Sequence, residues 1–334
     1  MLDMINSKYF RKQNTYSLII CVTVIIALCL IFGAGCSIGT DDEDIEVSDL
    51  EADDQVGIME YSGDKEGEYV TPEFNDSAFN DEKADDYGQV RLDISSVNLG
   101  YFGIEVSSDN SLKLQVIKGD DTYTYDINSE MNPEIIPLNM GNGKYEIKVM
   151  EAIGEQKYAK LWSDTINVEL DTKYSAFLRP SKMVNYNQDS QCVKLGQEIA
   201  NASDSDLELV SNAYEYLCEA ISYDNNKAAS VTSGYIPDPD ATLEERKGIC
   251  FDYAALSAAI FRSQGIPCQL ITGYVTSENV YHAWNKVYIK SEGWVTVEIS
   301  ADANDWQRID ITFAASGIDE ELGEDNEYTQ LYVY

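Results

Sequence analysis

The sequence predicts an α+β fold in its C-terminal part, where a helix that carries a cysteine packs on an antiparallel sheet. Two further observations complete the expected organisation. Short alternating runs over residues 91–171 are typical of a small β-sandwich, and an acidic, aperiodic stretch over 37–90 is typical of disorder. Residues 1–36 have the pattern of a leader, which leaves 172–334 for the α+β domain. A length of 334 residues agrees with roughly two folded domains.

The charge balance is strongly acidic. The chain holds 59 acidic and 23 basic residues, which gives a net charge of −36 at pH 7. Such a chain repels phosphate backbones and anionic lipid surfaces. We therefore expect no nucleic-acid partner, and we expect contact with a membrane only through the N-terminal leader.

The first 36 residues have the layout of a secretory signal. Basic residues up to Lys12 precede an apolar run from Ser17 to Phe32, and "GAGCS" follows. This ending resembles a bacterial lipoprotein signal, which implies lipid attachment at Cys36, although Gly33 replaces the usual leucine. The alternative is an uncleaved transmembrane anchor, since the run approaches the ~18 residues typical of a span. Both interpretations place the rest of the chain on the extracellular face of the bacterial cytoplasmic membrane.

Residues 41–90 form a predominantly acidic segment in which Lys65 and Lys83 are the basic residues, and the apolar residues follow no period. Such a segment cannot bury enough apolar surface to offset its ordering entropy, and its charges repel one another. We interpret 37–90 as a disordered spacer. A calcium-binding tract is the alternative, but no loop has the spacing of calcium ligands.

The region that follows alternates apolar and polar residues in short runs. "LKLQVIKGDDTYTYDIN" is an example, and turn signals such as "KGDD" and "GNGK" separate the runs. This pattern predicts an immunoglobulin- or fibronectin-like β-sandwich over 91–171. Nothing in the region suggests catalysis, so we expect a spacer or a packing partner for the next domain.

Two helices open the α+β domain. The first lies around "SQCVKLGQEIANAS", and the second, "SDLELVSNAYEYLCEAI", has a periodic apolar face and capping-box spacing between Ser205 and Glu208. The apolar face of the second helix comprises Leu207, Val210, Tyr214, Leu217 and Ile221.

Four cysteines lie beyond the leader: Cys192, Cys218, Cys250 and Cys268. If the two helices are antiparallel, Cys192 and Cys218 fall near the same end, where either a disulfide or two free thiols would suit an extracellular protein. The absence of a C-x-x-C motif and the single histidine argue against a Cys–His metal site. We expect no metal and no cofactor.

Cys250 opens a predicted helix, "CFDYAALSAAIFRSQG", whose alanines allow close packing and whose Gly265 suits the position after the helix end. Gly248 allows a tight approach into this helix. The unpaired N–H groups and positive dipole end of a helix favour a thiolate over a thiol, as an activated nucleophile requires. The alternative is an inert buried cysteine, which is a common fate for this residue.

The only histidine lies in "YHAWNKVYIKSEGWVTVEIS", which reads as a β-hairpin with its turn near "KSEG". If Val287 and Val295 share one apolar face, His282, Trp284, Thr296 and Glu298 share the opposite one. A carboxylate on that face could orient the imidazole. A turn of three or five residues preserves this alignment, whereas a turn of four residues breaks it.

The segment "GICFDYAALSAAIFRSQGIPCQLITGY", followed by "HAW" and "GWVTVEIS", resembles the transglutaminase-like superfamily of cysteine enzymes. Members show a G-x-C at a helix start, then R-x-x-G-I-P, an H-A-W strand and a W-x-x-V-D-P-T strand. The upstream "ISYD" is also similar. The resemblance covers roughly residues 182–300 and implies a papain-like transglutaminase core.

This resemblance implies a catalytic set in which Cys250 is the nucleophile, His282 the general base and Glu298 the orienting carboxylate. Glu298 replaces the family's aspartate, and Ile299 and Ser300 replace its Pro-Thr, so Asp302 is a second candidate for the carboxylate. Trp284 is a candidate groove wall or a packing residue.

The implied chemistry is transfer of an amide acyl group through a thioester, as in a peptidase, deamidase or crosslinking enzyme. Its substrates would be proteins or cell-wall peptides at the cell surface. The alternative function is that of a catalytically inactive binding or assembly module at the cell surface.

Overall fold

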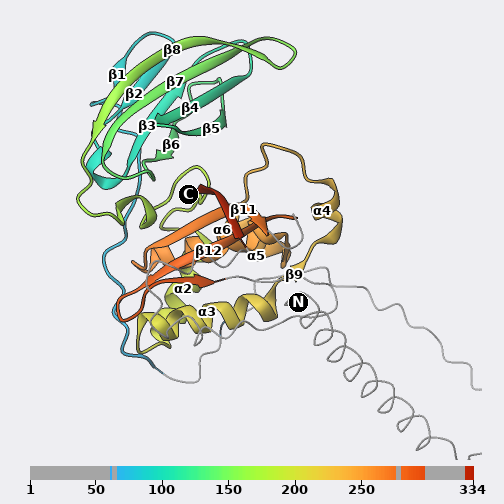
Figure 1. Ribbon diagram of the computed structural model, residues 1–334. Helices are drawn as coiled ribbons and strands as arrows, with labels where there is room; N and C mark the ends of the chain where they lie inside the picture. The colour runs from blue at the N-terminus through green and yellow to red at the C-terminus, as the bar shows by residue number, and fades with distance from the viewer. Residues whose placement is uncertain (1–60, 62–65, 276–279, 298–327) are drawn as a thin grey trace, which may run out of the picture. The chain divides into compact units, whose positions relative to one another are not determined.

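The computed structural model describes residues 61, 66–275, 280–297 and 328–334, which belong to one compact unit (Figure 1). The predicted leader and Cys36 lie outside these residues. Among the described residues, no helix is both long enough and apolar enough to cross a membrane.

Two four-stranded antiparallel sheets occupy the region that precedes the α+β domain. The first has the order β1-β2-β3-β6, with strands Asp85–Asp86, Val90–Asp93, Tyr101–Val106 and Glu134–Pro137. The second has the order β5-β4-β7-β8, with strands Asp121–Ile127, Leu112–Lys118, Gly143–Gly154 and Lys157–Val168. Two short 3₁₀ helices span Val97–Leu99 and Ser175–Phe177.

Side-chain alternation explains why these sheets pack. Alternate residues of β4 (Leu112, Leu114 and Val116) are buried, whereas their neighbours are partly exposed, as expected for a sheet with one covered face. Tyr123 of β5 also contacts the end of the chain, where its hydroxyl accepts a hydrogen bond from the Val333 backbone N–H at 3.0 Å. The sheet region therefore packs against the α+β domain.

The prediction of a disordered linker over residues 37–90 was wrong for residues 66–90. Residues 66–90 make defined contacts, because the Tyr69 hydroxyl donates a hydrogen bond to the Gln264 carbonyl at 2.8 Å and Thr71 donates to the Gln264 side chain at 2.9 Å. The backbone N–H of Asn80 donates to Asp93 at 2.8 Å. This part of the acidic segment has tyrosines and threonines whose partners lie far away in the sequence, which composition alone could not indicate. Residues 37–60 and 62–65 lie outside the described residues.

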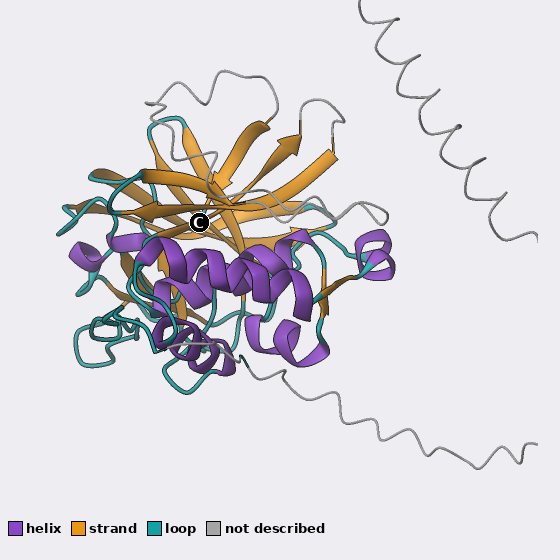
Figure 2. Ribbon diagram, turned by 90° about the horizontal axis from the view of Figure 1, so that it is seen from below, coloured by secondary structure: helices purple, strands orange, loops and turns teal. Residues whose placement is uncertain are grey.

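The α+β domain combines five described helices with a four-stranded antiparallel sheet, and Figure 2 shows the helices gathered together beside the strands. The helices are α2 (Gln191–Asn201), α3 (Asp206–Ala220), α4 (Asn225–Ser230), α5 (Pro239–Glu245) and α6 (Cys250–Ser263). The sheet order is β13-β12-β11-β14, with strands Gly293–Val297, Val280–Ile289, Cys268–Val275 and Tyr328–Val333. A short parallel pair joins β9 (Ser222–Tyr223) to β10 (Lys247–Gly248).

Helix α6 is the central element of this domain, since almost all of its side chains are buried. Its small alanines allow the close packing on the sheet that the sequence predicted. The Asn285 side-chain amide of β12 donates to the Ala254 carbonyl at 3.0 Å and to the Gln269 carbonyl at 3.2 Å, which joins helix to sheet. Gly265, with a φ of 78°, follows the helix end as predicted.

Arg262 near the end of α6 is fully buried, and burial lowers the pKa of its guanidinium. The guanidinium donates hydrogen bonds to the carbonyls of Cys268 at 2.9 Å, Arg179 at 3.1 Å and Tyr334 at 2.8 Å. These three acceptors come from distant parts of the chain, so one side chain holds α6, β11 and the β14 end together.

The helix cap predicted from Ser205 and Glu208 is present in part. The Ser205 hydroxyl accepts from the Glu208 N–H at 3.2 Å, and the Glu208 carboxylate reaches the N–H of Asp204, one residue before the cap, at 2.7 Å. Cys192, Cys218, Cys250 and Cys268 are all free, so the two-thiol alternative holds for Cys192 and Cys218.

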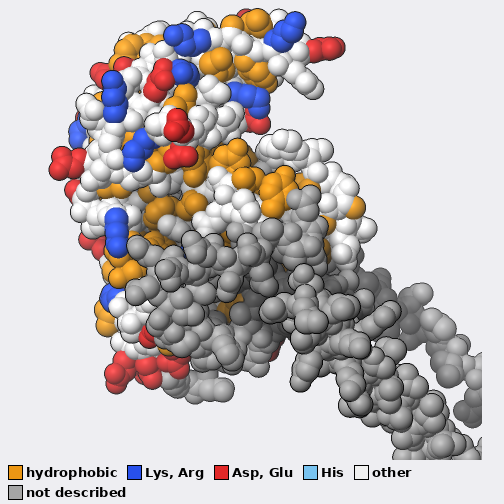
Figure 3. All heavy atoms as spheres, in the orientation of Figure 1, with side chains coloured by type: hydrophobic (Ala, Val, Ile, Leu, Met, Phe, Trp, Pro, Cys, Tyr) orange, Lys and Arg blue, Asp and Glu red, His pale blue; other side chains and the backbone are white. Residues whose placement is uncertain are grey.

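The surface seen in Figure 3 has Lys and Arg side chains interspersed with Asp and Glu over its described part. Large apolar side chains are also exposed on the sheet of the α+β domain, among them Tyr274, Tyr281 and Leu331.

Candidate active site

Cys250 is the first residue of α6, as the sequence predicted, and is half-buried. The parallel β9–β10 pair sets the entry to this helix, because Gly248 lies opposite Tyr223. Gly248 has no room for a side chain, since a Cβ there would lie 2.7 Å from the Cβ of Asp252. The thiol therefore sits at a helix start whose approach is fixed by close backbone packing.

A small pocket opens beside Cys250. Its lining consists of Cys250, Tyr253, Ala254, Ser257, Ala283, Trp284, Asn285 and Val297. Thus the start of α6 faces β12 and the end of β13. The part of β12 that reaches this pocket begins with the residue directly after His282.

The β12–β13 hairpin has the register that the sequence required. Asn285 lies opposite Val297 and Ile289 opposite Gly293, so the turn between the strands contains three residues. Val287, Ile289, Val295 and Val297 are buried on one face, as predicted.

His282 and Trp284 lie on the other face of β12, because alternate residues of a strand point to opposite sides. Their ring centroids are 6.3 Å apart and the rings are stacked. Trp284 is almost fully buried and lines the Cys250 pocket together with Ala283, Asn285 and Val297, which belong to the opposite face of the hairpin. The predicted role of Trp284 as a pocket wall agrees with this position.

The remaining predicted residues are not described. Glu298 directly follows Val297, and it lies outside the described residues, as do Ile299, Ser300 and Asp302. The structure therefore brings the Cys250 helix together with the strand that carries His282, while the carboxylate assignment stays a prediction from the family resemblance.

The sequence did not predict several charged and phenolic side chains that lie around Cys250. Asp252 is fully buried in the first turn of α6, and it contacts Lys227 and Tyr235. Burial, and then the neighbouring Cys250, raise the pKa of the Tyr223 phenol, which places this ring near the thiol. The sequence "CFDYA" shows Asp252 as the third residue of the predicted helix. Its partners Lys227 and Tyr235 could not be predicted, because they lie in a segment without regular periodicity.

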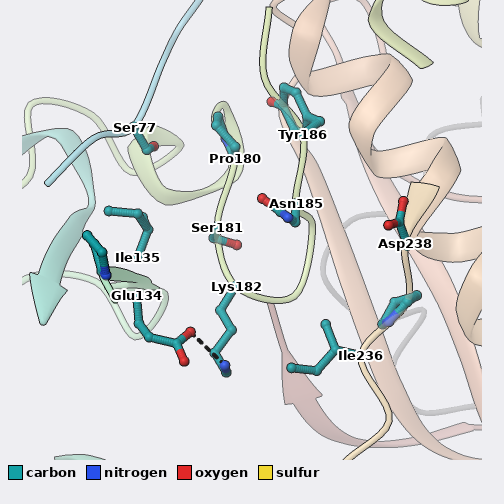
Figure 4. Close-up of a pocket in the computed structure, with 12 residues that line it drawn as sticks. Ser77, Glu134, Ile135, Pro180, Ser181, Lys182, Asn185, Tyr186, Ile236 and Asp238 are labelled. Carbon is teal, nitrogen blue, oxygen red and sulfur yellow. Dashed lines mark hydrogen bonds and ion pairs between the residues drawn. The ribbon is translucent and has the colours of Figure 1, made fainter. Parts of the chain in front are cut away.

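A second, larger pocket lies apart from the Cys250 site (Figure 4). It is lined by residues of four segments: Ser77, Pro133, Glu134, Ile135, Pro180, Ser181, Lys182, Asn185, Tyr186, Ile236, Pro237 and Asp238. Glu134 and Lys182 form an ion pair of 2.6 Å at its edge. This lining contains no cysteine or histidine, the residue types on which the predicted chemistry depends.

Comparison with known proteins assigns the α+β domain to a family. Residues 193–299 match the core of the transglutaminase-like superfamily. The chain is 27% identical over 106 residues to the uncharacterized protein YebA of Bacillus subtilis (strain 168). That alignment covers 27% of this chain and 13% of YebA, so the chain spans only a small part of this relative.

Solved structures of similar proteins are distant. Red sea bream transglutaminase shares 11% identity, with 59% of this chain and 48% of that chain covered and a TM-score of 0.25. Legionella pneumophila LapG shares 12% identity, with 43% and 82% covered and a TM-score of 0.25. The family match itself spans α2 to the end of β13, including the Cys250 helix and the His282 strand. Residues 193–299 of this chain therefore form a transglutaminase-like core domain.

Proposed function

We propose that this domain is a cysteine peptidase or amide acyltransferase in which Cys250 is the nucleophile, His282 the general base and Glu298 the orienting carboxylate. The observation that carries the proposal is the position of Cys250. It opens a buried helix and faces a pocket whose wall includes the strand residues directly after the only histidine of the chain.

In the first half of the reaction, the Cys250 thiolate attacks the carbonyl carbon of a peptide bond or side-chain carboxamide. A C–S bond forms, and the carbonyl π electrons move to oxygen. We assign the backbone N–H of Cys250 to stabilise this oxyanion, since the first N–H groups of a helix have no partner within the helix. The C–N bond then breaks, and the leaving amine takes a proton from the His282 imidazolium, which leaves a thioester on the enzyme.

In the second half, an acceptor attacks the thioester carbon while His282 removes its proton. Collapse of the second tetrahedral intermediate breaks the C–S bond and restores the thiolate. Water as the acceptor gives hydrolysis or deamidation, and a primary amine gives a crosslinked amide. Proteins and cell-wall peptides are the substrate classes we propose.

One observation favours a second candidate function, an inactive binding or assembly module. Glu298 stands where the family has aspartate, and its additional methylene changes the distance from which a carboxylate could approach the imidazole. Turnover assays distinguish the two functions.

The test compares wild type with Cys250→Ala on a peptide mixture rich in glutamine, with and without an added primary amine. Mass spectrometry separates new N-termini (peptidase), a mass gain of about 1 Da (deamidation) and amine adducts (transfer). Cys218→Ala is the matched control, because Cys218, like Cys250, is a half-buried cysteine. We expect Cys250→Ala to abolish turnover and Cys218→Ala to retain it. Full turnover in Cys250→Ala would refute the nucleophile assignment, and an inert wild type would favour the binding module.

We further propose that Cys36 carries a lipid and holds the domain on the outer face of the cytoplasmic membrane, with an uncleaved anchor as the alternative. The acidic residues 41–60 would then lift the domain away from an anionic envelope. Deleting 41–60 should reduce activity on cell-bound substrates and leave activity on soluble peptides unchanged. Equal loss on both substrates would contradict the spacer role. Metabolic labelling with an alkyne fatty acid should mark wild type but not Cys36→Ala, and equal labelling of both would refute lipidation at Cys36.

A further inference from the structure

The first turn of the Cys250 helix contains a buried carboxylate with three partners. Asp252 is fully buried. Its Oδ2 accepts a hydrogen bond from the Ile249 backbone N–H at 2.8 Å and forms an ion pair with Lys227 Nζ at 2.7 Å. Its Oδ1 accepts from the Tyr235 hydroxyl at 2.5 Å. Ile249 precedes the helix and has no side-chain acceptor of its own, so Asp252 supplies the cap for the helix that begins with the thiol.

Two of these partners come from one segment, residues 222–236. Lys227 lies in α4 and Tyr235 in the loop that follows. The Lys227 ammonium also lies 4.6 Å from the centroid of the Tyr235 ring. The three side chains, Lys227, Tyr235 and Asp252, therefore form one compact group, which we call the Asp252 cluster.

The other end of this segment is fixed by its backbone. The Asp224 N–H donates to the Gly248 carbonyl at 2.8 Å, and the Asp224 carboxylate accepts from the Lys227 N–H at 2.9 Å. Asp224 also pairs with Lys247 at 3.3 Å. Tyr223 precedes Asp224 and lies near Cys250, so the segment begins beside the thiol.

The charges of the Asp252 cluster also affect the Cys250 thiol. A carboxylate two residues after a cysteine, in the same helical turn, disfavours a thiolate when its charge is not balanced. Here the Lys227 ammonium balances it at ion-pair distance, and Asp252 is shielded from solvent, which limits screening. Burial would lower the pKa of Lys227, but the Asp252 carboxylate and the Tyr235 phenol raise it, so the lysine stays charged.

We propose that Lys227, Tyr235 and Asp252 position the nucleophile: they cap the Cys250 helix, fasten residues 222–236 over its start, and balance the Asp252 charge so that the Cys250 thiolate forms at lower pH. This proposal rests on the proposed function only in taking Cys250 as the reactive thiol. The cluster residues are positioning residues, since none of them lines the Cys250 pocket.

Other ionisable groups lie on the elements around this thiol. Tyr223 of β9 and Tyr253 of α6 are phenols whose pKa values burial raises, so both are neutral near pH 7. The Asp224–Lys247 pair at the β9–β10 junction is balanced. Among the described residues, His282 lies on β12, the strand that packs against α6, and is a further group whose ordinary pKa lies near neutrality. The variants below change the Asp252 cluster and leave these groups in place.

The experiment measures alkylation of Cys250 by iodoacetamide from pH 5 to 10 in the full chain, read peptide by peptide with mass spectrometry. Lys227→Met leaves the Asp252 carboxylate unbalanced. At an effective dielectric constant near ~20, an unbalanced charge in the same helical turn moves the pH midpoint of alkylation up by about one unit. Asp252→Asn leaves the lysine unbalanced and moves the midpoint down by a similar amount. The double variant returns it close to the wild-type value.

Three further variants complete the design. Lys227→Arg keeps the charge and should restore the wild-type midpoint. Lys194→Met changes an exposed lysine on α2 and should shift nothing. Tyr235→Phe removes only the hydroxyl, so it should loosen the segment and speed cleavage within 222–236 by a protease, with little change in the midpoint. Thermal melting confirms that each variant is folded.

Shifts of opposite sign in the two single variants support the proposal, because a merely structural defect would not reverse sign with charge. Shifts in the same direction, or no shift in either variant, overturn it. The His282→Ala variant tests the proposed function separately. If His282→Ala leaves the alkylation profile unchanged while Lys227→Met and Asp252→Asn shift it oppositely, the Asp252 cluster stands and the Cys–His pairing fails.

Discussion

Replacing the buried arginine of α6 tests the account of how the core domain is held together. Arg262→Met keeps a long side chain but removes hydrogen bonds to the carbonyls of Cys268, Arg179 and Tyr334. Each buried carbonyl that loses its donor costs about 1–3 kcal/mol, and relief of the buried charge offsets part of this sum. We expect a net loss of about 3 kcal/mol.

Thermal unfolding measures the effect. For a domain of this size, about 1 kcal/mol corresponds to roughly 2–4 °C in Tm, so Arg262→Met should lower Tm by about 6–12 °C. Arg179→Met is the matched control, because Arg179 is also buried but, among the described residues, donates two hydrogen bonds, to the Ser175 carbonyl at 3.4 Å and the Asp76 carbonyl at 2.7 Å. The decrease in Tm should be clearly smaller for Arg179→Met than for Arg262→Met. Equal Tm values for wild type and Arg262→Met would refute the role assigned to these three hydrogen bonds.

Two further predictions follow from the described side chains. Gly248→Ala should destabilise the domain by about 1–3 kcal/mol and slow Cys250 alkylation, because the new Cβ would meet the Asp252 Cβ at 2.7 Å; unchanged urea midpoints and alkylation rates would contradict this. Burial raises the pKa of Tyr69 to about 12, and burial and then Asp252 raise that of Tyr235 to about 12. Since the unfolded phenols ionise near pH ~10, their contribution to the free energy of unfolding is complete below pH 10 and is lost as the pH rises through 12. Urea unfolding at pH 8, 10 and 11.5 checks this, and a flat profile would contradict it.

The parts of the fold that the sequence predicted well are those with local causes. The apolar periodicity and the Ser205 cap predicted α3, and Gly265 marked the end of α6. The hairpin register followed from a period of two and a short turn, and the structure has that register. The family resemblance then linked the Cys250 helix to the His282 strand, and the family match spans both.

The parts that the sequence predicted poorly depend on distant partners. Tyr69 lies in an acidic stretch that looked disordered, yet its hydroxyl bonds to Gln264, which is 195 residues away. Strand β14 pairs with β11 at the sheet edge opposite β13, which no local pattern in its sequence indicates. The partners of Asp252 likewise lie in an irregular segment, so the carboxylate at the third helical residue gave no sign of the ion pair it forms.

The central claim is that the Cys250 thiol and the His282 imidazole act on each other. The chain has a single histidine, so its imidazole NMR signal needs no assignment and can be titrated in wild type and in Cys250→Ala. A thiolate–imidazolium pair predicts that the wild-type imidazole titrates at least about one pH unit above the value in Cys250→Ala, because the neighbouring anion favours the charged ring. Identical titration midpoints in the two proteins would contradict the claim.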